Sequence, residues 1–112
     1  MMLALMAAAS AVVVPHRPVV LAWNKPAGVT CTHRDELGRT TIYDCLRATL
    51  PAELAARKLN ACGRLDMNTT GLLIVTDDGS LVRHVTDPTA LGRGAAPLLK
   101  TYRCVVHKTT PE

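Results

Sequence analysis

The chain has 112 residues, enough for one small domain, and its 13 basic and 9 acidic residues give a formal net charge of +4. No acidic residue occurs in residues 88–108, so this stretch suits a polyanionic substrate bound through phosphate contacts, with a solvated loop as the alternative. Its lysines and arginines are Arg93, Lys100, Arg103 and Lys108.

The cysteines argue against a zinc site and against a disulfide framework, because they are widely spaced and never form a C-x-x-C pair. We therefore expect no metal, and reduced thiols in a reducing compartment. No nucleotide-binding motif occurs either, so we expect no cofactor. The four residues are Cys31, Cys45, Cys62 and Cys104.

Residues 1–18 form an apolar N-terminal extension that we place outside the fold. The run is too short to span a bilayer, and no basic residue precedes its Ala-Ala-Ser-Ala stretch, so it makes a poor signal peptide. Two interpretations stay open: a targeting segment or a misplaced start codon. We expect a cytoplasmic protein, or a mitochondrial or plastid one if the extension is a transit segment.

The first elements after the extension are a strand and a helix. Residues 19–23 are apolar and predict a buried strand that ends at the turn of residues 25–28. Thr41 with Asp44 three positions later forms a capping box, which predicts a helix that runs to Leu50 before a proline. Residues 53–59 add one or two further helical turns.

The second half of the chain also shows strand signals followed by helix signals. Residues 72–76 are the clearest strand, and Asp77 and Asp78 then serve as N-caps of a helix rather than as a metal pair. Residues 91–98 predict a mobile loop, and residues 99–107 alternate well enough to predict a strand. Together these elements predict an α+β fold with a mixed, largely antiparallel sheet and helices on its flanks.

Arg64 and Asp66 are the candidate site. Two positions apart, they lie on the same side of an extended backbone, where the cation can hold the acid ionised and aimed. The polar residues 68–71 then lead into the strand, an arrangement that fixes a single nucleophilic or acid/base carboxylate at a sheet edge. A surface ion pair is the alternative for an arginine and an aspartate taken alone.

The longer string around these two residues is more specific. Residues 63–79 read Gly-Arg-Leu-Asp-Met-Asn-Thr-Thr-Gly-Leu-Leu-Ile-Val-Thr-Asp-Asp-Gly. This string resembles the active-site motif of pseudouridine synthases, especially the group that modifies ribosomal RNA, with the small-subunit enzymes nearest. Three other segments resemble family elements in the same order: the N-K-P-x-G turn, the loop and helix after it, and the K-x-Y strand, at residues 24–29, 35–46 and 100–102.

The resemblance covers residues 19–108 and implies isomerisation of a specific uridine to pseudouridine in ribosomal RNA, with 16S-type RNA favoured. It implies no metal and no cofactor. The uridine would be flipped out of the RNA, and Asp66 would act on its ribose, as nucleophile at C1′ or as base at C2′. Arg64 would hold Asp66 ionised and fill the gap left by the base. Tyr102 would stack on the uracil, and Lys100 would support Tyr102 or touch phosphate.

Family members continue past the K-x-Y strand to complete the sheet and to supply a further arginine. The resemblance therefore implies that residues 19–112 are the N-terminal part of a catalytic domain whose C-terminal part is missing. Two alternatives to catalysis by this chain stay open. One is a non-catalytic RNA-binding module that uses Arg93, Lys100 and Arg103. The other is a half-domain that pairs with a separate partner chain through its open sheet edge.

Overall fold

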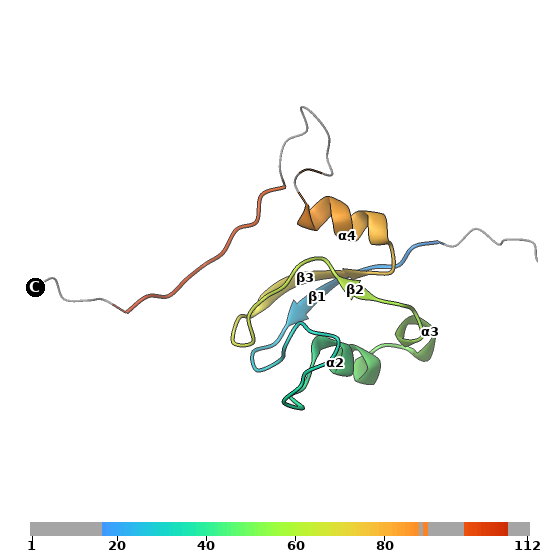
Figure 1. Ribbon diagram of the computed structural model, residues 1–112, viewed down its shortest axis with the longest axis horizontal. Helices are drawn as coiled ribbons and strands as arrows, with labels where there is room; N and C mark the ends of the chain where they lie inside the picture. The colour runs from blue at the N-terminus through green and yellow to red at the C-terminus, as the bar shows by residue number, and fades with distance from the viewer. Residues whose placement is uncertain (1–16, 88, 90–97, 108–112) are drawn as a thin grey trace, which may run out of the picture.

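The computed structural model describes residues 17–87, residue 89 and residues 98–107. Most of the predicted extension, most of the predicted loop 91–98, and Arg93 therefore lie outside the described residues. Figure 1 shows the arrangement of the elements along the chain. They are, in order, β1 (Val20–Lys25), α2 (Ile42–Thr49), α3 (Ala52–Ala55), β2 (Asn60–Ala61), β3 (Gly71–Thr76) and α4 (Gly79–Thr86).

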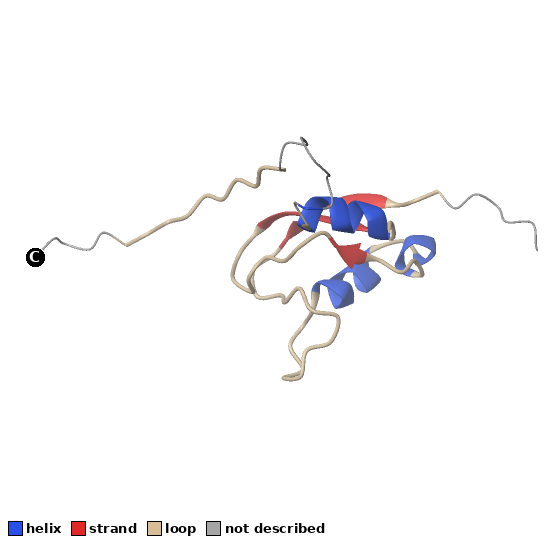
Figure 2. Ribbon diagram, turned by 45° about the horizontal axis from the view of Figure 1, so that its top comes forward, coloured by secondary structure: helices blue, strands red, loops and turns tan. Residues whose placement is uncertain are grey.

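A three-stranded antiparallel sheet forms the centre, with β3 between β1 and β2. Trp23 of β1 lies opposite Leu73 of β3, and Leu21 lies opposite Val75. Helices α2 and α3 lie on one side of the sheet and α4 lies on the other (Figures 1 and 2). The predicted α+β class with a largely antiparallel sheet and flanking helices is confirmed, and the one parallel pairing described is an isolated bridge between Thr30 and Thr41.

The core lies between the sheet and α2. Strand alternation places Leu73 and Val75 of β3 on the same face, and both are buried. The helix presents its buried side to that face, because its apolar residues recur at helical spacing. The buried apolar cluster consists of Val29, Ile42, Tyr43, Leu46, Leu59, Leu73 and Val75.

Capping residues set where the two longer helices begin. Thr41 accepts a hydrogen bond from the N–H of Asp44, whose carboxylate accepts one from the N–H of Thr41, so the predicted capping box is confirmed. That backbone hydrogen bond from Thr41 holds the pKa of Asp44 below its usual value. At α4, Asp78 is the N-cap, as predicted, and accepts hydrogen bonds from the N–H groups of Ser80 and Leu81.

Asp77 does not cap the helix, which corrects half of the expectation for the aspartate pair. Its carboxylate accepts hydrogen bonds from the N–H of Val19 at 2.8 Å and from Nη1 of Arg57 at 3.1 Å. With an exposed side-chain fraction of 4%, Asp77 joins the start of β1 to the segment that follows α3. The sequence gives no local signal for this role, because both partners are distant along the chain.

The strand predicted at residues 99–107 is wrong. These residues are exposed and form no strand, and in Figure 1 the segment runs away from the sheet. Alternating apolar residues do not make a strand unless a neighbouring strand pairs with its backbone, and none of the described strands does so. Val105 and Val106 are consequently 97% and 81% exposed.

Two smaller differences concern the middle of the chain. The helix predicted for residues 53–59 is the single turn α3, which ends at Ala55. Strand β2 has two residues, too few for a periodic pattern to reveal it. Within the described part of the chain, no helix has the length and apolar character needed to cross a membrane.

Candidate active site

The motif that contains Asp66 forms the loop between β2 and β3. Its start is tied to the sheet by Cys62, whose N–H donates to the carbonyl of Ile74 at 2.7 Å. Gly63 and Gly71 bracket the loop with φ angles of +99° and +132°, which residues with a Cβ rarely adopt. No heavy atom lies within 4 Å of a Cβ built at either glycine, so backbone conformation, not space, requires glycine here.

Asp66 begins a tight turn within this loop. The N–H of Thr69 donates to the carbonyl of Asp66 at 2.9 Å and closes the turn. The Asp66 side chain is exposed, and its carboxylate makes no hydrogen bond or ion pair with any residue that the structure describes. The turn therefore fixes the backbone of Asp66 and leaves its carboxylate accessible to a substrate.

A buried lysine supports this turn through hydrogen bonds to its backbone. Lys25, at the end of β1, is 0% exposed, and its Nζ donates to the carbonyls of Pro26, Met67 and Thr69 at 2.9, 3.0 and 2.9 Å. An ammonium has three donors, and these three carbonyls use all of them. Because two of the carbonyls belong to residues shortly after Asp66, Lys25 fixes the position of the Asp66 turn relative to the sheet.

Backbone hydrogen bonds from the first loop add to this support. The N–H of Gly28 donates to the carbonyl of Met67 at 2.8 Å, so that oxygen accepts two hydrogen bonds. The N–H of Leu65, directly before Asp66, donates to Sγ of Cys31 at 3.3 Å. The segment after β1 therefore contacts the loop of residues 63–71 on both sides of Asp66.

Arg39 approaches the same turn from the loop that precedes α2. Its Nη1 lies 3.9 Å from Sδ of Met67, while its Nε and Nη2 donate to the carboxylate of Asp35 at 3.0 and 2.9 Å. These hydrogen bonds from Arg39 hold the pKa of Asp35 below its usual value. The paired guanidinium thus has a fixed orientation beside the turn.

The predicted ion pair between Arg64 and Asp66 is not formed. Both side chains are exposed, and no hydrogen bond or salt bridge joins them. Long exposed side chains lose rotamer freedom on pairing and gain little in water. Arg64 instead lines a cavity of about 330 Å³ that also contacts His33, Tyr43 and Asn60.

Lys100 and Tyr102 do not meet Asp66 in this structure. Both are exposed, Tyr102 by 60%, and neither forms a hydrogen bond with the loop of residues 63–71. Burial and the Asp78 carboxylate raise the pKa of the Cys62 thiol, and the Lys100 ammonium acts in the opposite direction.

The cysteines are free thiols, and only Cys62 among them is buried. Within the described residues, no three side chains of histidine, cysteine, aspartate or glutamate lie close enough together to hold a metal ion. The polar groups around Asp66 are instead backbone donors and acceptors together with basic side chains. Such a site can present a carboxylate to an anionic substrate.

The sequence analysis did not predict that Lys25 supports the Asp66 turn. A signal for it was present, because Leu21, Trp23 and Lys25 alternate along β1, so a lysine at the last position faces the core. A lysine placed inward needs acceptors nearby. The pattern could not reveal that these acceptors come from a turn more than forty residues later, at Met67 and Thr69.

Comparisons with known proteins identify the family of this chain. The family model for RNA pseudouridylate synthases matches residues 19–112. The ribosomal small subunit pseudouridine synthase A of Vibrio cholerae is 41% identical over 73 residues, which are 65% of this chain and 29% of that protein. The ribosomal large subunit pseudouridine synthase B of Pseudomonas aeruginosa is 48% identical over 69 residues, 62% of this chain and 17% of that protein.

A solved structure of a pseudouridylate synthase superimposes with a TM-score of 0.52 at 36% identity, covering 66% of this chain and 29% of that one. The chain thus spans less than a third of the length of these relatives. Because relatives named for both ribosomal subunits match, the expected preference for small-subunit RNA stays a prediction. With the family model matching most of its length, the chain belongs to the RNA pseudouridylate synthase family.

Proposed function

We propose that this protein converts a uridine of ribosomal RNA to pseudouridine, with Asp66 as the catalytic carboxylate. The observation that carries the proposal is the Asp66 turn. Its backbone is held by buried Lys25, and its carboxylate is accessible and unpaired with any described residue. Membership of the family supplies the reaction class.

The reaction exchanges one bond to the ribose for another. The bond between N1 of uracil and C1′ breaks, the base turns over, and a bond forms between C5 and C1′. The proton on C5 leaves to solvent and N1 gains one, so no oxidant or reductant is needed. Asp66 acts on the ribose either as nucleophile at C1′, displaced when C5 attacks, or as base at C2′.

The other predicted site residues would act on the flipped nucleotide. Arg64, exposed two residues before Asp66, would occupy the gap that the uridine leaves in the RNA. Tyr102 would stack on the uracil and assist proton transfer at C5, with Lys100 beside it on phosphate. For these roles, their segment would have to move onto the loop of Asp66.

Small-subunit RNA is the proposed substrate, with large-subunit RNA as the alternative. Residues 69–71 and 76–79 carry this preference by their resemblance to the small-subunit group. The cytoplasm is the proposed compartment, because ribosomal RNA is modified where ribosomes are made, and an organelle matrix is the alternative.

Tritium release from RNA labelled at C5 of uridine tests the proposal. A protein in which residues 19–112 are followed by the C-terminal part of the family's catalytic domain should release tritium, and Asp66→Asn should abolish release. Glu53→Gln, which changes an exposed acid on α3, is the matched control and should retain it. Undiminished release by Asp66→Asn would end the assignment of the catalytic residue.

A second candidate is RNA binding without catalysis. The exposed, unpaired segment of residues 98–107 favours it, because Lys100 and Arg103 are available to phosphates. This function predicts salt-sensitive RNA binding that Asp66→Asn leaves unchanged. It also predicts that neither the wild type nor Asp66→Asn releases tritium. Tritium release by the wild type would exclude this function as the whole account.

A further inference from the structure

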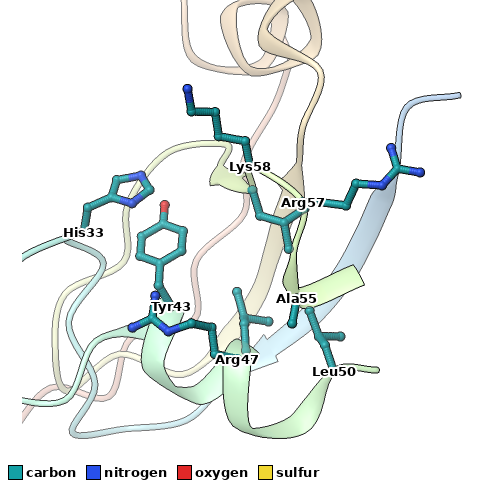
Figure 3. A pocket seen from close by; sticks show the side chains of 9 residues that line it. His33, Tyr43, Arg47, Leu50, Ala55, Arg57 and Lys58 are labelled. Atoms are coloured by element: carbon teal, nitrogen blue, oxygen red, sulfur yellow. The ribbon is translucent and has the colours of Figure 1, made fainter. Parts of the chain in front are cut away.

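His33 and Tyr43 form a flat aromatic stack outside the Asp66 turn. Their ring centroids are 3.8 Å apart and their planes differ by 9°. Tyr43 is 8% exposed and belongs to the core, whereas His33 is exposed, so one face of the imidazole covers the tyrosine and the other faces solvent. Figure 3 shows the two rings side by side at one end of a cavity.

Hydrogen bonds fix the orientation of this stack. Nε2 of His33 lies 2.9 Å from Oδ1 of Asn60, and the Tyr43 hydroxyl accepts a hydrogen bond from the N–H of Ala61 at 3.0 Å. Both partners belong to β2, so the rings are anchored to the strand that leads directly into the catalytic loop. An exposed aromatic face with a fixed orientation is a surface on which a nucleic-acid base can stack.

Two cavities meet at the stack, and both are lined by His33 and Tyr43. The first, of about 180 Å³, reaches Arg47 and Lys58, and the second, of about 330 Å³, reaches Arg64 of the catalytic motif. Among the residues that the structure describes, no acidic side chain lines either cavity. A continuous surface therefore runs from the catalytic motif, across the exposed imidazole, to basic side chains of α2 and of the segment before β2.

The cationic side chains of this surface differ in how readily a phosphate group could bind them. Arg57 is engaged by Asp77, and Figure 3 shows its side chain directed towards β1. Arg47 forms an exposed pair with Asp44, which costs little to exchange for a phosphate. The Lys58 side chain forms no hydrogen bond or ion pair with a described residue. Lys58 and Arg47 are thus the cations that a phosphate backbone could recruit.

We propose that the exposed face of His33, backed by Tyr43, stacks on an RNA base next to the target uridine, while Lys58 and Arg47 contact phosphates of the same strand. The proposal rests on the proposed function for the identity of the RNA. It adds a second RNA-contact region outside the Asp66 turn. This region binds a neighbouring nucleotide by stacking on its base rather than by hydrogen bonds to the base edge.

Binding of a fluorescein-labelled, single-stranded oligoadenylate, followed by anisotropy, tests the stacking surface. This probe contains no uridine, so binding is separate from catalysis. His33→Ala should weaken binding about tenfold, whereas His33→Phe, which keeps an aromatic plane, should stay within about twofold of the wild type. His84→Ala, at an exposed histidine of α4, is the control and should bind as the wild type does.

Two further measurements complete the test. An oligomer without bases should bind wild type and His33→Ala equally, because it offers only phosphates. Lys58→Ala should lower the slope of log affinity against log salt by about one. Equal binding by wild type and His33→Ala, equal loss in His33→Ala and His33→Phe, or no binding by the wild type would each overturn the proposal. Stacking without tritium release would instead contradict only the proposed function.

Discussion

Nζ of Lys25 lies 3.0 Å from the carbonyl oxygen of Met67, the residue that follows Asp66. The same oxygen also accepts a hydrogen bond from the N–H of Gly28, so the end of β1 and the turn after it both bind a single atom of the loop that contains Asp66. This contact joins residues more than forty positions apart. It explains how the backbone at Asp66 can keep a fixed position although no described side chain holds the carboxylate.

Replacing Lys25 with methionine should destabilise the protein by about 3 kcal/mol, because three part-buried carbonyls each lose a charged donor while the side-chain volume is nearly kept. Urea denaturation measures the change. Lys58→Met, at an exposed lysine, is the control and should stay within about 0.5 kcal/mol of the wild type. Equal stability of the two variants would contradict the role assigned to Lys25.

Gly71→Ala should cost about 1 to 3 kcal/mol, since a φ of +132° strains any residue that carries a Cβ. Gly79→Ala is the matched control, because Gly79 begins α4 without a positive φ and has the same open space around a built Cβ. Thermal unfolding compares the two. If Gly71→Ala were no less stable than Gly79→Ala, backbone conformation would not be what requires glycine there.

Acid should destabilise the fold partly through Asp78. The hydroxyl of Ser80 and then the backbone N–H groups of α4 hold the pKa of Asp78 below its usual value, so its contribution is present above the unfolded value of about 3.9. That contribution is lost as pH falls through the lower folded-state pKa. Urea midpoints between about pH 2 and 6 measure it.

Asp78→Asn separates charge from capping in that experiment, because asparagine also caps helices but does not titrate there. The variant should retain most of the stability at neutral pH and lose less stability than the wild type on acidification. An unchanged dependence on pH would show that Asp78 does not contribute to acid sensitivity.

Arg57→Ala should destabilise the protein by about 2 kcal/mol, because it removes one partner from the Asp77 carboxylate, whose side chain is 4% exposed. Arg47→Ala breaks a pair whose side chains are 62% and 48% exposed and should cost at most about 0.5 kcal/mol. Denaturant titration of the two variants under one set of conditions gives the comparison. If Arg47→Ala lowered the free energy of unfolding as much as Arg57→Ala does, burial would not be what makes the Arg57–Asp77 pair more important.

Elements with a local signal could be predicted from the sequence. The capping box at Thr41 and Asp44, the apolar run of β3 and the N-cap Asp78 each act within a few residues, and all three are found. The family motif likewise located the loop of Asp66. These features depend on neighbours that the sequence places side by side.

The features that could not be predicted depend on distant partners. The hydrogen bonds of Lys25 and those of Asp77 both join segments far apart in the chain. The alternation in residues 99–107 is real, but a strand also needs a pairing partner, which no described strand provides. The spacing of Arg64 and Asp66 permits an ion pair, but solvent competes with it successfully.

Mapping of pseudouridine in ribosomal RNA from cells that express either the wild-type gene or its Asp66→Asn variant tests the central claim most directly. Carbodiimide modification followed by primer extension reads every uridine of both subunits. We predict that one pseudouridine is present with the wild type and absent with the variant, with its position in small-subunit RNA. Identical pseudouridine maps from the two strains would contradict the claim that this protein isomerises uridine through Asp66.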